Sequence, residues 1–126
     1  MANPNIVNVA AIYGNTSTTS LTTTSVTSIV SNASGSNKVY RIVSLVVANV
    51  DGSTAADITI NVYSNATAGS GSAFAVASTI SVPADSTLIV VDKTTSFYLL
   101  EDRSIGAIAG SANDLVVTCS WEEINS

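Results

Sequence analysis

The side chains that carry out most protein chemistry are scarce in this sequence. Its 126 residues contain no histidine, one cysteine, and nine acidic residues against four basic ones. Histidine is the commonest general base and transition-metal ligand, so its absence excludes Ser-His-Asp and Cys-His catalytic arrangements. The sequence also has no glycine-rich phosphate-binding motif and no paired-cysteine metal motif, which leaves nucleotide and zinc sites without support.

Carboxylates are the remaining groups with catalytic potential. A glycosidase needs two of them, one on each side of a sugar bond, and the candidate pairs are Asp92 with Asp102 and Glu101 with Asp114. All four lie in turn-like segments near Ser, Thr, Asn or Gly, where acidic residues ordinarily end strands. We therefore expect a protein that is not an enzyme, without catalytic residues or a cofactor.

The segment from Asp51 to Asp57 (DGSTAAD) brings two carboxylates and several carbonyl groups together. Calcium requires oxygen ligands of this kind. The segment lacks the alternating acids and the bidentate glutamate of an EF-hand loop, so we interpret it as a solvated hairpin loop without a metal ion. Calcium binding is the alternative.

The cysteine and the tyrosines also lack a pattern that indicates chemistry. Cys119 alternates with Leu115, Val117 and Trp121 in one run, so we expect a buried, inert thiol. A sugar-binding platform needs clustered aromatic rings, whereas the four tyrosines are dispersed: Tyr13, Tyr40, Tyr63 and Tyr98.

The charge excludes two classes of partner. The net charge is −5, and the four basic residues are scattered among acidic ones, so neither nucleic acid nor an anionic membrane is expected to bind. No apolar run approaches the ~20 residues of a membrane span, and the first residues lack the features of a signal peptide. We expect synthesis in a cytoplasm, without an export signal.

The composition favours contacts with other proteins. Charged residues make up only 10% of the chain, although about 25% is usual. The surface must therefore carry mainly Ser, Thr, Asn and Ala, whose short side chains lose little rotamer entropy when a partner orders them. Compositional drift without functional meaning is the alternative explanation.

Apolar and polar residues alternate along most of the chain, which is the pattern of strands with one buried face. Strands are expected at about 22–31, 38–50, 57–63, 74–82, 87–91, 96–100, 104–109 and 115–124. No helical period is sustained. The fold class is therefore predicted as all-β, a single-domain antiparallel β-sandwich or jelly roll of about eight strands.

Three details of these strands can be tested. Residues 38–50 carry apolar side chains on both faces in their second half, so they should form a central strand, with Asp51-Gly52 as the turn of a hairpin to residues 57–63. In the strand at 74–82, Phe74, Val76, Ile80 and Val82 fall on one face. Pro83 should end that strand, because proline lacks the amide donor.

The first part of the chain has a different composition. Residues 1–37 contain no charged side chain, and fourteen of the twenty-two residues from Thr16 to Asn37 are Ser or Thr. We divide the chain into an extended, flexible N-terminal arm at 1–21, with its extended segment from Ile6 to Tyr13, and a sandwich domain at 22–126. An uncharged arm is suited to docking on a neighbouring subunit, and a frayed tail without function is the alternative.

Four short motifs in the second half of the chain form a recognisable series. They are Val82-Pro83-Ala84, the segment YLLEDRSI at 98–105, Ala112-Asn113-Asp114, and Trp121-Glu122-Glu123-Ile124. The series resembles the C-terminal half of small virion structural proteins of tailed bacteriophages, especially marine cyanophages. The segment NKVYRIVSLVVANVDGSTAADITINVY is similar to the first hairpin of that family, so the resemblance covers roughly residues 37–124. Arg103 departs from it, since the family often has a plain acidic-glycine turn there.

The resemblance implies a structural role in the virus particle, with the chain made in the cytoplasm of a host bacterium. The expected function is that of a capsid decoration or cement protein, and the alternatives are a small tail or fibre component or a host-glycan-binding module. The expected partners are the major capsid protein, further copies of this chain in a homo-oligomer such as a trimer, or both. The expected contact residues are Ala2, Asn3, Asn5, Ile6, Val7, Tyr13, Asp51, Ala66, Thr67 and Ser70.

Overall fold

The computed structural model describes residues 4–125 and confirms the all-β prediction, with nine strands and no helix in that range. Consequently no helix long and apolar enough to cross a membrane occurs there. The strands are β1 (Ala11–Ser20), β2 (Thr27–Asn32), β3 (Lys38–Asn49), β4 (Ala56–Tyr63), β5 (Ala73–Val82), β6 (Thr87–Val91), β7 (Phe97–Leu99), β8 (Arg103–Ala109) and β9 (Leu115–Asn125).

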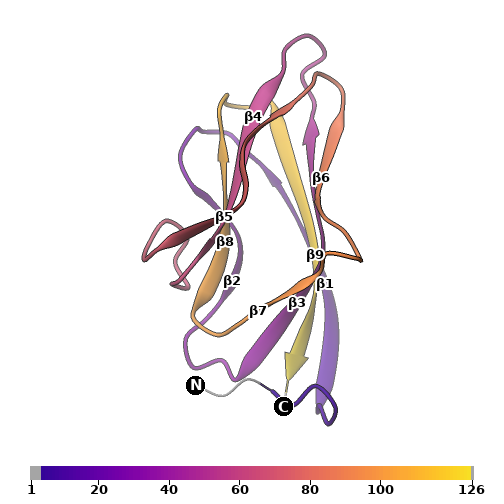
Figure 1. Ribbon diagram of the computed structural model, residues 1–126, viewed down its shortest axis with the longest axis vertical. Coiled ribbons are helices and arrows are strands. Elements are labelled where there is room, and N and C mark those ends of the chain that lie inside the picture. The colour runs from indigo at the N-terminus through magenta and orange to yellow at the C-terminus, as the bar shows by residue number, and fades with distance from the viewer. Residues whose placement is uncertain (1–3, 126) are drawn as a thin grey trace.

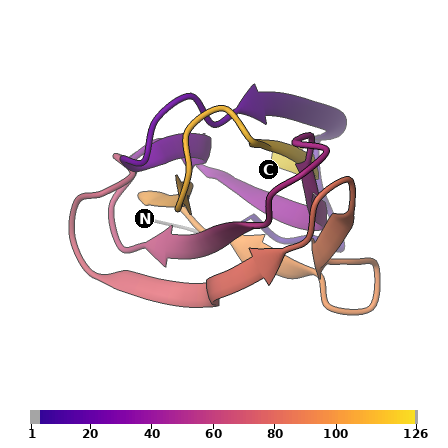
Figure 2. The same cartoon turned by 90° about the horizontal axis from the view of Figure 1, so that it is seen from above.

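Two antiparallel sheets face each other, as Figure 1 shows. Sheet A has the strand order β1-β9-β3-β6, with β7 also paired to β3, and sheet B has the order β2-β8-β4-β5. The fold is thus a sandwich, as predicted. Viewed from above in Figure 2, β5 follows the lower rim of the molecule, at the edge of sheet B.

The strand β3 is central, as its apolar pattern predicted. It pairs with β9 on one side, from Lys38 opposite Asn125 to Asn49 opposite Leu115, and with β6 and β7 on the other. Its inward side chains Ile42, Leu45 and Val47 are fully buried. Fully burying a side chain of this size stabilises the fold by about 1.5–3 kcal/mol.

The core between the sheets is built from the alternating residues of nearly every strand. It includes Ile58 and Ile60 of β4, Ile105 of β8, and Val117 and Cys119 of β9. The Cys119 side chain is fully buried, and this burial raises the pKa of its thiol to about 12. The prediction of a buried thiol is therefore confirmed.

The predicted hairpin between β3 and β4 is wrong. The two strands belong to different sheets, so the Asp51-Gly52 loop crosses from sheet A to sheet B. The buried side chain of Asn49 fixes this crossing: its amide Nδ2 donates to the carbonyl oxygens of Thr54 and Val82, both at 2.9 Å, and its Oδ1 accepts from the Asp51 amide. A turn dipeptide predicts a reversal of the chain, but it does not decide which sheet the next strand joins.

A second buried asparagine joins the sheets at the opposite end of the sandwich. Asn32, the last residue of β2, donates from Nδ2 to the carbonyl oxygens of Lys38 and Leu99, at 3.0 and 3.1 Å. Its Oδ1 accepts from the Ser36 hydroxyl. Both asparagine side chains are thus fully used as links between backbone segments that belong to different sheets.

Part of the predicted N-terminal arm belongs to the sandwich. Residues Ala11–Ser20 form β1, which pairs with β9 along its whole length and is an edge strand of sheet A. Leu21, directly after it, is fully buried. The second strand begins at Thr27, not near residue 22, because residues 22–26 form an exposed bend. The segment outside the sheet is thus limited to the residues before Ala11.

The prediction that the apolar residues of β5 fall on one face is confirmed for three of the four residues. Phe74, Ile80 and Val82 lie opposite Val62, Ile58 and Ala56 of β4, so they share the face that β4 turns to the core. Only Val82 is buried, and Phe74, Val76 and Ile80 are exposed. Sheet A ends at the short strand β6, and most of β5 before Val82 is exposed, including Phe74 and Ile80 on the face that β4 turns to the core.

Candidate contact surfaces

The N-terminal segment before β1 contains a short turn and is hydrogen-bonded to β9 at its second end. The Val7 amide donates to Oδ1 of Asn5 at 3.0 Å, and the Ala10 amide donates to the carbonyl oxygen of Asn125 at 2.9 Å. Pro4 is buried, whereas Val7 is 92% exposed. The turn therefore holds a large apolar side chain in solvent, with almost no contact to its own domain.

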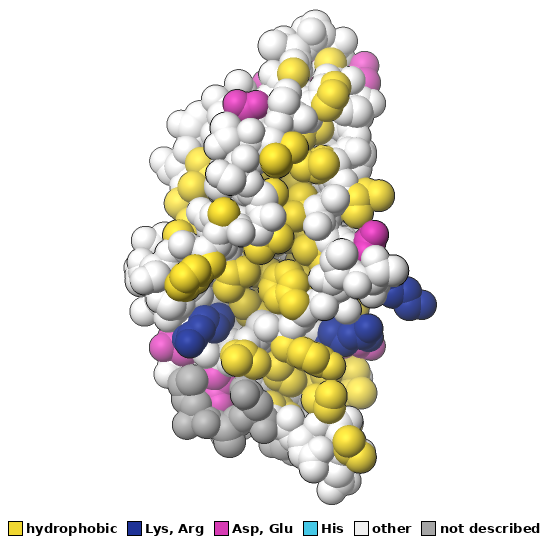
Figure 3. Space-filling model, viewed as in Figure 1, with side chains coloured by type: hydrophobic (Ala, Val, Ile, Leu, Met, Phe, Trp, Pro, Cys, Tyr) yellow, Lys and Arg dark blue, Asp and Glu magenta, His cyan; other side chains and the backbone are white. Residues whose placement is uncertain are grey.

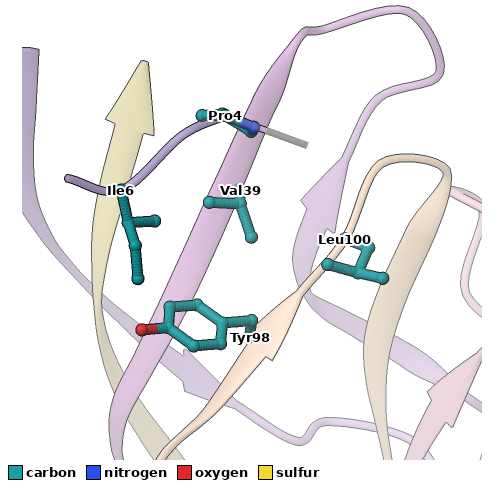
Figure 4. A pocket seen from close by; sticks show the side chains of 5 residues that line it. All are labelled: Pro4, Ile6, Val39, Tyr98 and Leu100. Atoms are coloured by element: carbon teal, nitrogen blue, oxygen red, sulfur yellow. The ribbon is translucent and has the colours of Figure 1, made fainter. Parts of the chain in front are cut away.

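A small apolar hollow of about 230 Å³ lies beside this turn. Figure 4 shows its five lining residues, which come from the N-terminal segment, the start of β3, and β7 with the residue after it: Pro4, Ile6, Val39, Tyr98 and Leu100. The volume is below the ~300–1,000 Å³ of sites for small ligands. An apolar side chain of a partner protein fits it better than a cofactor.

The hollow belongs to a wider apolar area on the outer face of sheet A. Ile12 of β1, Ile124 of β9 and Val39 of β3 lie in one row across three strands, so they share that face. We call the exposed part of this area the N-terminal surface, and it consists of Ile6, Val7, Ile12, Tyr98 and Leu100. Two of the predicted contact residues, Ile6 and Val7, lie in it.

The two exposed tyrosines do not form a joint stacking platform. Tyr13 lies opposite Glu123, which lies opposite Tyr40, whereas Tyr98 lies opposite Arg41. Adjacent positions of a strand point to opposite faces, so Tyr13 and Tyr98 lie on different faces of sheet A. Of the other two tyrosines, Tyr40 stacks on Trp121 with a ring separation of 6.2 Å, and Tyr63 is buried.

A more polar hollow of about 370 Å³ lies further along the outer face of sheet A. It contains the ion pair of Arg41 Nη1 with Glu122 Oε1 at 3.1 Å, and Lys93 lies at its rim. Both members of the pair are more than one-third exposed, so solvent screening leaves the pair little effect on stability. Sequence reasoning missed this site because its residues come from four separate segments.

The carboxylate of Asp51 accepts hydrogen bonds from within its own loop. Oδ1 of Asp51 accepts from the amide and the hydroxyl of Ser53, at 2.9 and 3.0 Å, and these bonds lower the pKa of the Asp51 carboxyl. Across residues 4–125, no three acidic or cysteine side chains lie together in a way that could hold a metal ion. The loop at Asp51 lies at the far end of the sandwich from the N-terminal surface (Figure 1).

The loop from Ser64 to Ser72 is folded against sheet B. The amide of Ala66 donates to Oδ1 of Asp102 at 3.1 Å, and the hydroxyl of Ser104 donates to the carbonyl oxygen of Asn65 at 2.8 Å. Thr67 and Ser70 are exposed on the loop, whereas Ala66 is half-buried. These three predicted contact residues therefore form a second area, apart from the N-terminal surface.

The predicted contact residues are thus divided among three places. Asn5, Ile6, Val7 and Tyr13 lie at the end of the sandwich where β1 begins, Asp51 lies at the other end, and the loop residues lie against sheet B. Ala2 and Asn3 lie outside the described residues. Sequence reasoning missed Ile12, Tyr98 and Leu100, which join Ile6 only through the pairing of β1, β9, β3 and β7.

The pair Glu101 and Asp114 does not have the geometry of a glycosidase. Glu101 follows β7 at the end of β3 near Tyr40, whereas Asp114 precedes β9 at the other end near Asn49, which is about 30 Å away along the strand. The carboxylate pairs of glycosidases are about 5–10 Å apart. Glu101 is also buried, and its carboxylate has no hydrogen-bond partner among residues 4–125.

The carboxylates of the second pair, Asp92 and Asp102, accept hydrogen bonds from nearby turn and loop residues. Oδ1 of Asp92 accepts from the amide and hydroxyl of Thr94, at 2.9 and 2.7 Å, which lowers the pKa of the Asp92 carboxyl. Asp102 holds the loop of sheet B through Ala66. Each carboxylate therefore has a local structural role that explains its position.

Neither a protein-family model nor a curated protein matches this sequence.

Proposed function

We propose that this protein is a non-catalytic structural protein of a phage particle, which decorates and stabilises the capsid by binding the lattice of the major capsid protein. The observation that carries the proposal is the N-terminal surface. It combines a solvent-exposed Val7 and an apolar hollow for a partner's side chain, and three of its five residues belong to the first 37 residues, which carry no charge. The proposed location in a phage particle is based on the resemblance of residues 37–124 to small virion proteins.

The physical basis of such binding is the burial of apolar side chains at many equivalent sites. Val7, Ile12 and Ile6 are all at least half exposed, and burial of each by a partner contributes about 1–2 kcal/mol at 25 cal/mol per Å². Such a contact is weak by itself. Repetition over a lattice makes the total attachment strong, and expansion of the shell must then break many contacts at once.

The charged side chains beside this surface are paired with one another, which suits a lattice contact. Arg41, which lies opposite Tyr98, forms an ion pair with Glu122, and Lys38 forms one with Glu123. A neutral apolar surface avoids burying unpaired charges, which are expensive to remove from water. Binding is therefore expected to change little with salt concentration, in contrast to binding through charged patches.

The test is a binding assay with capsids that lack this protein. The substitution Val7→Asp places a charge in the N-terminal surface, where the side chain touches almost nothing of its own domain, so folding should be unaffected. The matched control is Val50→Asp, at the other end of the sandwich, where Val50 is 59% exposed. The proposal requires that Val7→Asp lowers capsid occupancy at least tenfold while Val50→Asp does not.

A deletion is a less suitable test, because of β1. Removing residues 2–16 would take away half of a strand that pairs with β9 and would unfold part of sheet A. A deletion that ends before Ala10 leaves β1 intact. Unchanged occupancy after that shorter deletion would refute the role of the N-terminal surface.

The tail or fibre alternative differs in copy number and in ligand. A tail component binds few sites per particle, and a glycan-binding module requires aromatic rings that stack on sugars. Tyr13 and Tyr98 lie on different faces of sheet A, so no joint platform supports the glycan hypothesis. If the purified protein bound a glycan array, and Tyr98→Ala abolished that binding, the glycan function would replace the capsid function.

A further inference from the structure

The polar hollow on the outer face of sheet A has no part in the proposed function. Its volume of about 370 Å³ lies within the ~300–1,000 Å³ of sites for small ligands. Four segments line it: residues 14–16 of β1, Arg41 and Val43 of β3, residues 120–122 of β9, and Lys93 between β6 and β7. We call these lining residues the polar hollow.

The polar hollow contains a glycine that the fold itself does not require. A Cβ atom added at Gly14 would meet nothing within 4 Å, and Gly14 does not have a positive φ. The strand β1 pairs with β9 without a register shift, so no bulge requires a glycine either. A glycine inside a strand weakens it, and where no bulge or bend explains it, it often marks the close approach of a ligand or another chain. The missing side chain therefore indicates space kept for a bound group.

The charged side chains of the polar hollow favour an anionic ligand. The chain has only four basic residues, and two of them, Arg41 and Lys93, line the polar hollow. Nη1 of Arg41 donates to Oε1 of Glu122 at 3.1 Å, whereas Lys93 forms no ion pair within residues 4–125. Basic groups are rare elsewhere: on the side visible in Figure 3, the Lys and Arg side chains all lie below the middle of the molecule. The lining thus has one positive charge in excess, in a protein of net charge −5.

The remaining polar groups suit a ligand with several hydroxyl groups. Oγ1 of Thr16 and Oγ of Ser120 lie 2.9 Å apart and share one hydrogen bond. Each hydroxyl has one proton and two lone pairs, so this pair can still donate one hydrogen bond and accept others. Glu122 lies in one row with Gly14 and Arg41 across three strands, and its carboxylate can accept from a ligand hydroxyl. Val43 adds an apolar group to the lining.

We infer that the polar hollow binds one acidic sugar unit of a glycan, that is, a sugar ring that carries a carboxylate. The ring lies over Gly14, its carboxylate lies between Arg41 and Lys93, and its hydroxyls bond to Thr16, Ser120 and Glu122. An arginine can bind a carboxylate through N–H groups that its ion pair leaves free. Tyr98 is not part of this lining, so the site does not depend on aromatic stacking. The inference goes beyond the proposed function and does not require a capsid.

The test is an NMR titration of the isotope-labelled chain with methyl β-D-glucuronide, a single acidic ring with a blocked linkage position. This probe has about 14 non-hydrogen atoms, which for an ordinary ligand corresponds to a dissociation constant of about 1 mM. A titration from about 0.1 to about 20 mM brackets that value. The amide signals of the polar hollow should shift. Methyl β-D-glucoside lacks the carboxylate and acetate lacks the ring, so each should bind about tenfold more weakly or worse.

Two variants separate the shape of the polar hollow from its charge. Gly14→Val fills the space over β1 with a residue that favours strands, so the fold should be kept while the dissociation constant for the glucuronide rises about tenfold or more. Its control is Thr18→Val, on the same face of β1 but outside the lining, which should change the constant by less than about twofold. Lys93→Gln should weaken binding of the glucuronide about fivefold and leave that of the glucoside unchanged. Lys38→Gln, which removes a paired lysine outside the lining, is the control for charge.

Three outcomes would overturn the inference. They are the absence of shifts in the polar hollow up to the highest concentration, binding of the glucoside or acetate as tight as that of the glucuronide, and equal effects of Gly14→Val and Thr18→Val. The same spectra show whether each variant is folded. None of these outcomes bears on capsid binding through the N-terminal surface, because Val7 lies outside the polar hollow.

Discussion

Replacing Gly106 with alanine tests how the loop from Ser64 to Ser72 is packed on sheet B. Gly106 lies in β8, and a Cβ atom there would come within 2.8 Å of Cε2 of Tyr63, 3.0 Å of Cγ1 of Val26 and 3.2 Å of Cβ of Ala68. Real Cβ atoms essentially never approach other heavy atoms to less than 3.0 Å. The ring of Tyr63 is buried, and its hydroxyl accepts from Nδ2 of Asn61 at 3.3 Å, so the ring cannot move freely aside.

The expected effect of Gly106→Ala is a loss of about 1–3 kcal/mol of unfolding free energy, the usual range for adding a carbon atom to a packed site. For a domain of this length, the loss lowers Tm by roughly 4–12 °C. The control is Gly14→Ala in the edge strand β1, where nothing lies within 4 Å of the new Cβ. Alanine there should be neutral or stabilise the strand by up to ~1 kcal/mol. Urea denaturation measures the free energy of unfolding of both variants. Equal values for Gly106→Ala and Gly14→Ala would refute the described packing of the loop.

Three further predictions concern the core and the turns. Asn49→Ala should lower the free energy of unfolding by about 2–4 kcal/mol, because it removes the hydrogen bond to the buried carbonyl oxygen of Val82 and the part-buried bonds to Thr54 and Asp51. In the same urea titration, Asn8→Ala on the exposed N-terminal turn should have almost no effect. The Cys119 thiol, with its pKa of about 12, should react with a thiol reagent near pH 8 only when the protein unfolds, so fast labelling of the native protein would contradict its burial. Hydrogen bonds from Thr94 lower the pKa of Asp92, so their contribution to stability is present above the ordinary pKa of 3.8 and is lost as the pH falls through the lowered value. Asp92→Asn should therefore weaken the decrease in stability between about pH 5 and pH 2, and an unchanged pH profile would count against this bond.

Most strands could be predicted because their signals are local. Alternation of apolar and polar residues gave the range of β6 to the residue and those of β7, β8 and β9 to within one or two residues. The turn at Pro83 was also predictable, since proline cannot donate to the ladder and Asp85 after it adopts a positive φ of 57°. These features depend only on neighbouring residues.

The pairing of the strands could not be predicted in the same way. The residues after β3 predict a turn, but the crossing to sheet B depends on Asn49 reaching Val82, far along the chain. The strand β1 was assigned to an arm because its Ser and Thr residues lack an apolar alternation. It joins sheet A through backbone hydrogen bonds to β9, which every residue type except proline can make.

The candidate surfaces could likewise be predicted only where they depend on neighbouring residues in the sequence. The exposure of Ile6 and Val7 followed from an uncharged segment at the start of the chain, and the loop at Thr67 and Ser70 followed from its Gly, Ser and Ala content. The hollow beside Ile6 depends on Tyr98, which only the pairing of β7 with β3 brings near. The exposure of Phe74, Val76 and Ile80 in β5 depends on which strands lie opposite them, which no single strand encodes.

The most direct test of the central claim, that this chain attaches to a capsid lattice, is its copy number in purified phage particles. Quantitative mass spectrometry of intact particles gives the ratio of this chain to the major capsid protein. We expect a fixed ratio, with the copy number of this chain of the same order as the number of capsid subunits. Val7→Asp should lower this ratio and Val50→Asp should leave it unchanged. A few copies per particle, or none, would contradict the account.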